Sequence, residues 1–402
     1  MKRVVVTGQG TINALGIDVA STIQAMSESR CAIGQMEFTD INRLNIRIGG
    51  QIKNFDPKEY FERQELSLYD RFTQFAVFAA REAILQSGLI FEGELSHYSG
   101  VILGTAGGGL QTQDESYRAV YQEGKNRVHP FIVPRLMNNA AVSHVSLANN
   151  LKGPSFTVST ACASSNHAIG QAFHLVRSGA AQVMITGGSE SMLCFGGIKA
   201  WEGLRVMSHD GCRPFCATRN GMVQGEGAAI FVFEEYEHAR ARGALILAEI
   251  SGFAMTSDAA DIVMPSIGGA RRAILAALKD AKMNPEEIGY INAHGTGTVA
   301  NDKTETSAIK EVFKGHAKNL MVSSTKSMHG HLIGGTGAVE LIACIAALKD
   351  GMIAPTVGYE KADPNCDLDI IPNHARDKKV SAVMSNAFAF GGLNAVIALR
   401  SI

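Results

Sequence analysis

The sequence lacks the features that mark membrane, secreted and disulfide-bonded proteins. No stretch approaches the roughly 18 apolar residues of a transmembrane helix, and only a short apolar run follows the first two basic residues, so we expect neither a membrane span nor a secretory leader. The seven cysteines are odd in number and contain no C-x-x-C pair, which argues against a disulfide framework. Together these absences predict a soluble protein of the reducing cytoplasm.

An excess of charge of either sign is also missing. The 37 lysines and arginines balance 38 aspartates and glutamates, so no global field draws the protein to nucleic acid or to a membrane surface, and any acidic partner must be met by a local patch. What the chain does have is 402 residues, a hydrophobic fraction of 46% and 42 glycines. This is enough for a large core in one globular unit or in two fused units of roughly 200 residues.

Three pairs of segments resemble each other and occur in the same order. One pair is a Ser-Thr turn that enters an apolar helix, one is an apolar strand that enters a Gly/Thr loop, and one is a glycine followed by an apolar strand. The pairs are 159–184 with 324–354, 101–109 with 291–298, and 225–234 with 391–400. The repeated order predicts two homologous halves, about 1–250 and 251–402.

Each half alternates strands with helical patterns of 10 to 15 residues, which favours mixed α/β layers with mostly parallel pairing. Two such halves stacked on each other predict a five-layer αβαβα sandwich, with loops of both halves meeting at a pseudo-twofold site. The first half has additional sequence over about 111–141. We expect this insertion to cap the site or to build an interface.

One cysteine, Cys162, lies in the stretch FTVSTACASSNHAIG, between a short strand pattern and a helical pattern formed by Ile169, Phe173 and Val176. This predicts Cys162 in the first turn of a helix, where unpaired N–H groups and the positive end of the dipole favour a thiolate. Free cysteines are more often small buried hydrophobes, so the stretch alone leaves a nucleophile and an inert core residue both open.

Two segments add histidines: His294 in NAHGTGT, and His329 with His331 in STKSMHGHLIGG. A single histidine is more often a hydrogen-bonded structural residue than a catalytic one. The spacing of His329 and His331 is compatible with metal ligation, but no acidic or cysteine partner stands at a matching spacing, so we predict no metal.

Lys326 in the same segment is flanked by apolar and small residues, which points to a buried position. Glu340 follows fourteen residues later in an otherwise apolar helix. Because an unpaired charge would be costly in such surroundings, we expect Glu340 to be the buried partner of Lys326.

Taken together, these motifs resemble the β-ketoacyl-acyl-carrier-protein synthases, condensing enzymes of fatty-acid synthesis with the thiolase fold. The resemblance covers essentially the whole chain, through GPSFTVSTACASS, CRPFCATRNGMVQGEGAA, INAHGTGTVANDKTE, SSTKSMHGHLIGGTGAVE and SNAFAFGGLNAV. It implies an acyltransferase that loads an acyl chain on a cysteine and condenses it with malonyl-acyl carrier protein, losing CO₂ and adding two carbons. It also implies no cofactor, because phosphopantetheine of the carrier protein holds the substrates.

The resemblance gives each motif residue a role. The expected Cys-His-His triad is Cys162, His294 and His331, with Lys326 and Glu340 as paired charges behind it. Two neutral imidazole N–H donors would stabilise the enolate that forms when malonyl loses CO₂.

A second set of residues is expected to hold the substrate. The backbone N–H groups of Cys162 and Phe390 would form an oxyanion hole, and the glycines after Phe390, beginning with Gly391, would allow that loop to approach. Phe390 also matches an aromatic gate over the nucleophile, with a plain core phenylalanine as the alternative. Thr296 and Thr298 match positions that hydrogen-bond the pantetheine arm.

The chain departs from the general synthase II pattern at several places. Gly107 stands where a bulky isoleucine is usual in the acyl pocket, which predicts room for long acyl chains. The usual basic cluster before YDRF is thinned, so docking of an acidic carrier protein must depend on other residues. The candidates are Arg63, Arg71, Arg127 and Arg205. Relatives are homodimers, and the 111–141 insertion is expected to supply much of that contact.

DIVMPSI, STKSMH and ADPNCDLD also resemble a narrower branch, the rhizobial nodulation protein E group, which elongates special acyl chains for lipid signals. Housekeeping elongation and this specialised role both remain open on motifs alone. A third possibility is a non-catalytic, chain-length-factor-like partner of another synthase. Such partners lack the nucleophile, whereas Cys162 and both histidines are present here.

Overall fold

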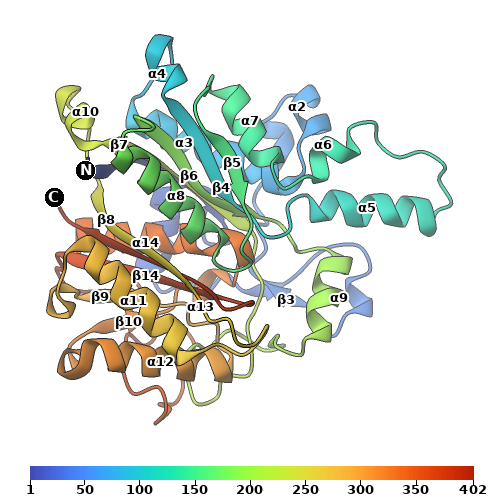
Figure 1. Cartoon of the computed structure of the whole chain (residues 1–402). Coiled ribbons are helices and arrows are strands. Elements are labelled where there is room, and N and C mark those ends of the chain that lie inside the picture. Colours follow the sequence, from blue (N-terminus) through green and yellow to red (C-terminus); the bar gives the residue numbers. More distant parts are fainter.

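The computed structural model describes residues 1–402 and contains one continuous 11-stranded sheet (Figure 1). The first half of the chain contributes strands in the order β5, β4, β6, β7, β1, and the second half contributes β10, β9, β14, β15, β8, with β12 outside β10. The strands of the first half are β1 (Val4–Asn13), β4 (Ser99–Gly104), β5 (Ser155–Val158), β6 (Val183–Glu190) and β7 (Gly227–Glu235). Those of the second half are β8 (Ala248–Ser257), β9 (Tyr290–Asn292), β10 (Met321–Ser323), β12 (Asp369–Ile370), β14 (Ala382–Ala389) and β15 (Leu393–Arg400).

The two halves repeat not only the strand order but also the sense of each pair. β4 runs parallel to β5 and β6, as β9 runs parallel to β10 and β14, and β7 and β15 are each antiparallel to both neighbours. β1 and β8 join the two parts through a short antiparallel pairing of Val4–Val6 with Ala248–Ile250. The duplication inferred from the sequence is therefore present in the topology, and the division placed at residue 250 falls inside β8.

Helices form three layers around the two parts of the sheet. α8 (Ser164–Ser178) and α14 (Thr336–Asp350) lie between the parts and contact strands of both (Figure 1). α3 (Arg71–Ser87) and α7 (Ala140–Ala148) cover the outer face of the first half, and α11 (Ile267–Ala281), with α12 (Val299–Phe313) packed beside it, covers that of the second. This arrangement is the predicted αβαβα sandwich.

The remaining elements are short or peripheral. No helix combines the length and the apolar character needed to cross a membrane. The remaining helices are α1 (Val19–Ser27), α2 (Arg63–Leu68), α4 (Gly93–His97), α5 (Leu110–Tyr121), α6 (Ile132–Leu136), α9 (Phe195–Gly203), α10 (Tyr236–Ala241) and α13 (Lys326–His329). Two small ribbons pair β2 (Gly34–Gln35) with β3 (Ile48–Gly49) and β11 (Met352–Ile353) with β13 (Arg376–Asp377).

Burial on both faces explains why the strands read as continuous apolar runs. In β7, Phe231 and Phe233 belong to the core between the two parts of the sheet, whereas Ile230 and Val232 belong to the outer core beneath α3. β15 divides its side chains between the central core and the outer core of the second half in the same way. Successive side chains of a strand point to opposite faces, and here both faces are covered by helices.

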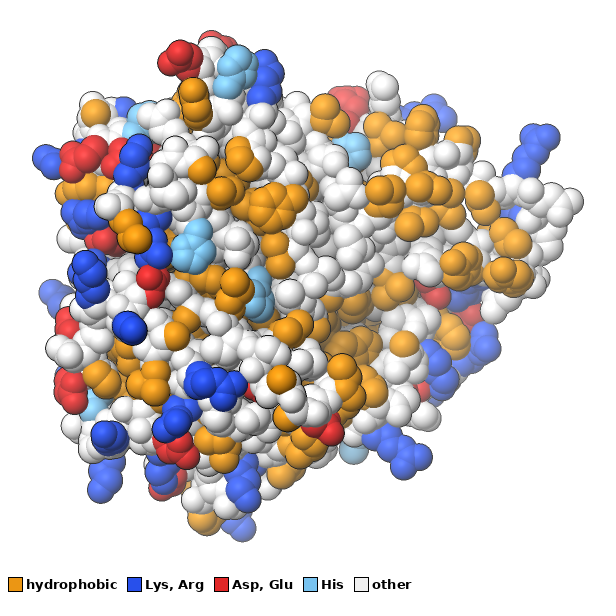
Figure 2. All heavy atoms as spheres, viewed as in Figure 1, with side chains coloured by type: hydrophobic (Ala, Val, Ile, Leu, Met, Phe, Trp, Pro, Cys, Tyr) orange, Lys and Arg blue, Asp and Glu red, His pale blue; other side chains and the backbone are white.

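The insertion of the first half forms α5 and α6, which project from one side of the sandwich (Figure 1). Figure 2 shows apolar side chains gathered on this side of the molecule. Its exposed large apolar residues are Tyr117, Val120, Tyr121, Val128, Phe131, Val133 and Met137. None of them lines the cavity that contains Cys162. The structure therefore gives no support for the predicted cap, and the interface stays a prediction.

Candidate active site

A cavity of about 150 Å³ brings together loops of both halves at Cys162. Its wall contains Cys162 from the loop before α8, His294 from the loop after β9, and His331 from the loop after α13. One side-chain atom of each, the thiol sulfur and one nitrogen of each ring, lie within 4.8 Å of one another. Thr296, Thr298 and Phe390 also line this cavity.

Cys162 lies directly before α8, not in its first turn, because α8 begins at Ser164 with Ala163 as its N-cap. Ala161 has a φ of +49°, a left-handed conformation that alanine rarely adopts, so the chain turns sharply into the helix and presents the thiol to the cavity. The backbone N–H groups of Cys162 and Phe390 both face Sγ and stabilise its anion. These are the two groups that the family resemblance assigns to the oxyanion hole.

The environment of Cys162 differs from the prediction in one respect. Cys162 is only 6% exposed, and this burial raises the pKa of its thiol to about 12. Lys326 and the two backbone N–H groups lower this pKa, but they do not offset the loss of water. Burial therefore opposes the thiolate expected near neutral pH and favours a thiol as the resting form.

Both histidines are buried and neutral. Burial, reinforced by the charge of Lys326, lowers the pKa of His294 and of His331 well below the ordinary value. Nδ1 of His331 accepts from the backbone N–H of Ile333 at 3.1 Å and contacts Oγ1 of Thr336 at 2.7 Å, so the proton of this ring is on Nε2. Nε2 has no partner in the protein and is free to donate to a substrate oxygen.

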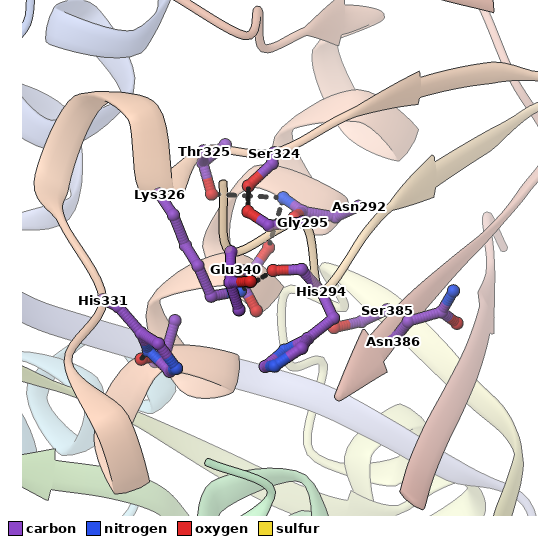
Figure 3. A network of polar contacts seen from close by, with 12 residues as sticks. Asn292, His294, Gly295, Ser324, Thr325, Lys326, His331, Glu340, Ser385 and Asn386 are labelled. Carbon is purple, nitrogen blue, oxygen red and sulfur yellow. Dashed lines mark hydrogen bonds and ion pairs between the residues drawn. The ribbon is translucent and has the colours of Figure 1, made fainter. Parts of the chain in front are cut away.

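Lys326 and Glu340 form an ion pair behind the histidines, with side-chain exposures of 0% and 1% (Figure 3). Nζ of Lys326 donates to Glu340 and also to the backbone carbonyl of His294. Burial raises the pKa of Glu340 to about 7, although Lys326 lowers it. Neither residue lines the cavity, so the pair acts on the site through the charge of Lys326 and through the loop that carries His294.

Cysteine and two histidines are also a donor set that zinc accepts. In this site the buried Lys326 cation would repel a zinc ion. The same repulsion lowers the pKa of both imidazoles, because it disfavours their protonated forms. Burial also disfavours the thiolate form of Cys162, which is the form that binds a metal. These electrostatics favour a metal-free site, which stays a prediction.

Family comparison decides what this arrangement belongs to. The N-terminal domain of beta-ketoacyl synthases matches residues 1–239, and the C-terminal domain matches residues 247–360. The chain belongs to the β-ketoacyl synthase family. It is therefore a condensing enzyme of the acyltransferase type, as its motifs predict.

Two groups of curated relatives match over the full length. Nodulation protein E of Rhizobium leguminosarum bv. trifolii is 47% identical over 401 residues and covers 100% of both chains. The 3-oxoacyl-[acyl-carrier-protein] synthase 2 of Synechocystis is 41% identical over 407 residues, covering 99% of this chain and 98% of the relative. The resemblance to both the synthase II family and its nodulation branch is thereby confirmed.

Solved structures share the fold of this β-ketoacyl synthase. A beta-ketoacyl synthase from Burkholderia phymatum STM815 is 33% identical, covers 100% of both chains and superposes with a TM-score of 0.92. A type II polyketide ketosynthase in complex with its acyl-carrier protein is 29% identical, with a TM-score of 0.90 over 100% of this chain and 99% of that one. The predicted thiolase-like fold is confirmed.

Two buried carboxylates that the sequence analysis did not single out hold the loops of the site. Glu305 of α12 accepts from the backbone N–H groups of His294 and Gly295, both at 2.8 Å. Glu190, at the end of β6, accepts from the backbone N–H groups of Ala106 at 2.7 Å and Gly334 at 3.0 Å, which ties the two halves together. The signal that identified Glu340, an acid among apolar or small residues, was also present at Glu190.

Gly107 does not line the cavity that contains Cys162. A Cβ atom placed on Gly107 would lie 2.3 Å from Cε of Met192, so the methionine occupies the space that the missing side chain leaves. The expected opening at Gly107 is therefore filled in this conformation. Because methionine has three rotatable bonds, the same space opens if Met192 changes rotamer.

The four arginines proposed for carrier docking have different surroundings. Arg71 pairs with Glu226 at 2.7 Å and lies 4.7 Å from the ring centre of Phe75, so it is a structural residue and unavailable for docking. Arg63, Arg127 and Arg205 are exposed. Only Arg205 is next to the cavity wall, since Val206 lines the cavity.

Proposed function

We propose that this chain is a 3-oxoacyl-[acyl-carrier-protein] synthase that loads an acyl chain on Cys162 and condenses it with malonyl-acyl carrier protein. The observation that carries the proposal is the convergence of one thiol, two backbone N–H groups and two neutral imidazoles at one cavity. The full-length match to 3-oxoacyl-[acyl-carrier-protein] synthase 2 supports the same reaction.

The first step is acyl transfer to a protonated thiol. Sγ of Cys162 attacks the thioester carbonyl, the new S–C bond forms, and the carrier thiol leaves with the proton that Cys162 gives up. No hydrogen bond within the protein fixes the ring of His294, whose buried Nδ1 is unpartnered. His294 is therefore the imidazole able to relay this proton, whereas His331 already holds its proton on Nε2. The N–H groups of Cys162 and Phe390 stabilise the oxyanion.

The second step forms the carbon–carbon bond. Malonyl loses CO₂ and leaves an enolate, whose oxygen accepts from Nε2–H of His331 and from the His294 ring. The enolate carbon attacks the acyl-Cys162 carbonyl, the S–C bond breaks, and the released Cys162 thiolate takes up one proton from solvent. Neutral donors suit this step because they stabilise the developing charge without first taking up a proton. We propose that no metal or other cofactor takes part.

Substrate delivery on an acyl carrier protein is part of the proposal. Thr296 and Thr298 line the cavity with their hydroxyl oxygens 2.8 Å apart, in a suitable place to bind the amide groups of a pantetheine arm. The complex of a related polyketide ketosynthase with its acyl-carrier protein supports this class of partner. Arg205 is the best-placed docking residue because its neighbour Val206 lines the cavity. Arg63 and Arg127 are exposed, but neither is next to a cavity residue in the sequence.

We further propose a homodimer in the cytoplasm. The exposed apolar residues of the 111–141 insertion lie together in one segment rather than singly. Such grouped apolar residues are typical of protein–protein contacts. The adjacent edge strand β5 has Phe156 42% exposed and one side free for pairing. The seven free thiols suit a reducing compartment.

A specialised role in the manner of the nodulation protein E group is the second candidate. It is favoured by an identity of 46–47% to two such proteins, against 40–41% to the synthase 2 relatives. The two candidates share one chemistry and differ in acyl chain. A non-catalytic partner role is disfavoured because the nucleophile and both histidines face one cavity.

Intact-protein mass spectrometry tests the proposal. The enzyme is incubated with acyl carrier proteins bearing C6 to C18 chains, saturated or unsaturated, and malonyl-carrier is then added. We expect one acyl mass on the wild type and on Cys31→Ala, which removes an exposed thiol, and none on Cys162→Ala. The adduct should discharge as a 3-oxoacyl product two carbons longer. No adduct with any chain would overturn the proposal, and the chain-length profile separates the two candidates.

A further inference from the structure

The chain has one tryptophan, Trp201, and it lies in the wall of the cavity that contains Cys162. Its ring stacks on Phe390, with ring centres 6.0 Å apart and an angle of 23° between the planes. Both rings are partly buried and both line the cavity. Stacked aromatic pairs contribute stabilisation beyond the area that they bury.

The two rings belong to different structural elements. Trp201 belongs to α9, which is anchored at both ends: Asp114 accepts from the N–H of Gly196 at 3.0 Å, and Glu202 accepts from the N–H groups of Asn45 at 2.6 Å and Ile46 at 2.9 Å. Phe390 lies on the turn between β14 and β15, where the N–H of Gly391 donates to the backbone carbonyl of Ile262 at 2.8 Å. Trp201 therefore offers a fixed surface that holds the Phe390 ring in this conformation.

The two residues after Phe390 adopt backbone conformations that favour glycine. Gly391 and Gly392 have φ angles of +83° and +67°, which only glycine adopts at low cost. The N–H of Phe390 faces Sγ of Cys162, so the ring and the oxyanion donor belong to one residue. A backbone movement of this turn that lifts the ring from Trp201 also displaces this N–H group, whereas a rotation about the side-chain bonds of Phe390 moves the ring alone.

We propose that Trp201 is a positioning residue: it is the surface against which Phe390 closes, and it sets both access to Cys162 and the placement of the Phe390 N–H. This inference deepens the proposed function and rests on it. Trp201 stacks on the ring of Phe390 and acts through that residue. Loss of the stack should therefore open the cavity and weaken the oxyanion hole together.

Substitutions at Trp201 separate the stack from simple packing. Trp201→Leu keeps an apolar side chain but removes the aromatic face, whereas Trp201→Phe keeps both. We expect Trp201→Leu to accelerate alkylation of Cys162 by iodoacetamide about two- to tenfold. This factor corresponds to the free energy that one stacked aromatic pair contributes. It should lower kcat for condensation by a similar factor without changing KM for malonyl-carrier. Trp201→Phe and Ala200→Ser, which alters an exposed residue of the same helix, should stay near the wild type.

The wild type provides a readout that needs no variant. Because Trp201 is the sole tryptophan, its fluorescence reports the stack directly, and the emission should change as the acyl adduct forms. Cys162→Ala should show no such time-dependent change. Adduct formation without any change in emission, or equal alkylation rates for Trp201→Leu and wild type, would overturn the inference. Absence of the adduct itself in the wild type would instead overturn the proposed function, so the two failures are distinguishable.

Discussion

The loop before α8 and the loop before α14 occupy equivalent places in the two halves, but they carry different chemistry. The first is a single tight turn that presents Cys162 to the cavity. The second contains a short helix, α13, and places His331 at the cavity while burying Lys326 against Glu340. The duplicated topology determines where the two loops meet. The side chains of each loop then decide whether that loop supplies the nucleophile or the electrostatics.

The largest expected effect is at the nucleophile of the first loop. Cys162→Ala should abolish the acyl adduct and reduce condensation by about 10⁴-fold or more, because no covalent intermediate can form. Decarboxylation of malonyl-carrier should persist, since the second loop is intact. Measuring CO₂ release beside product formation checks both points. Loss of decarboxylation in a folded variant would show that the two loops do not divide the reaction.

The converse change is His331→Ala in the second loop. It removes an oxyanion-type donor, so decarboxylation should fall about 10²- to 10³-fold while acyl loading of Cys162 continues. Intact mass gives the adduct, and CO₂ release gives the decarboxylation rate. His329→Ala is the matched control, because His329 is buried two residues away but does not line the cavity. Equal losses of loading and decarboxylation would contradict the division of roles.

The third prediction concerns the protonation state of Cys162. With a pKa of about 12 the thiolate is a minor form near neutrality, so alkylation by iodoacetamide should rise about tenfold per pH unit from pH 7 to 9. A thiolate stabilised by the helix end would instead give a rate that is flat over this range. Mass spectrometry of the peptide containing Cys162 distinguishes the two results. A plateau below pH 8 would restore the first interpretation of the sequence.

The smallest expected effect is at the rim of the cavity. Arg205→Glu should raise KM for acyl carrier protein about three- to tenfold, and more at low salt, because an exposed charge acts through screened attraction. Arg240→Glu is the control, since Arg240 is also exposed but lies on α10, away from the cavity. An unchanged KM in Arg205→Glu would show that docking depends on other residues.

Much of the fold was predictable because it depends on local pattern. The repeated order of apolar strands and helices follows from runs such as the one in β7, whose alternate residues enter two different cores. The motif residues of the site were also identified by sequence, and the structure brings Cys162, His294, His331, Thr296, Thr298 and Phe390 to one cavity. That the two parts of the sheet join through β1 and β8 was not predicted, because a pairing of three residues between distant segments leaves no periodic signal.

By itself, then, the sequence determined the duplicated α/β layers, the family and the candidate reacting groups, since each of these depends on residue types and their order. Only the tertiary structure decided that burial raises the pKa of the Cys162 thiol, that Arg71 is committed to Glu226, and that Met192 fills the space beside Gly107. The physical reason is the same in all three cases. A pKa, an ion pair and a filled volume depend on the desolvation and packing supplied by residues far away in the chain, and linear order does not specify those neighbours.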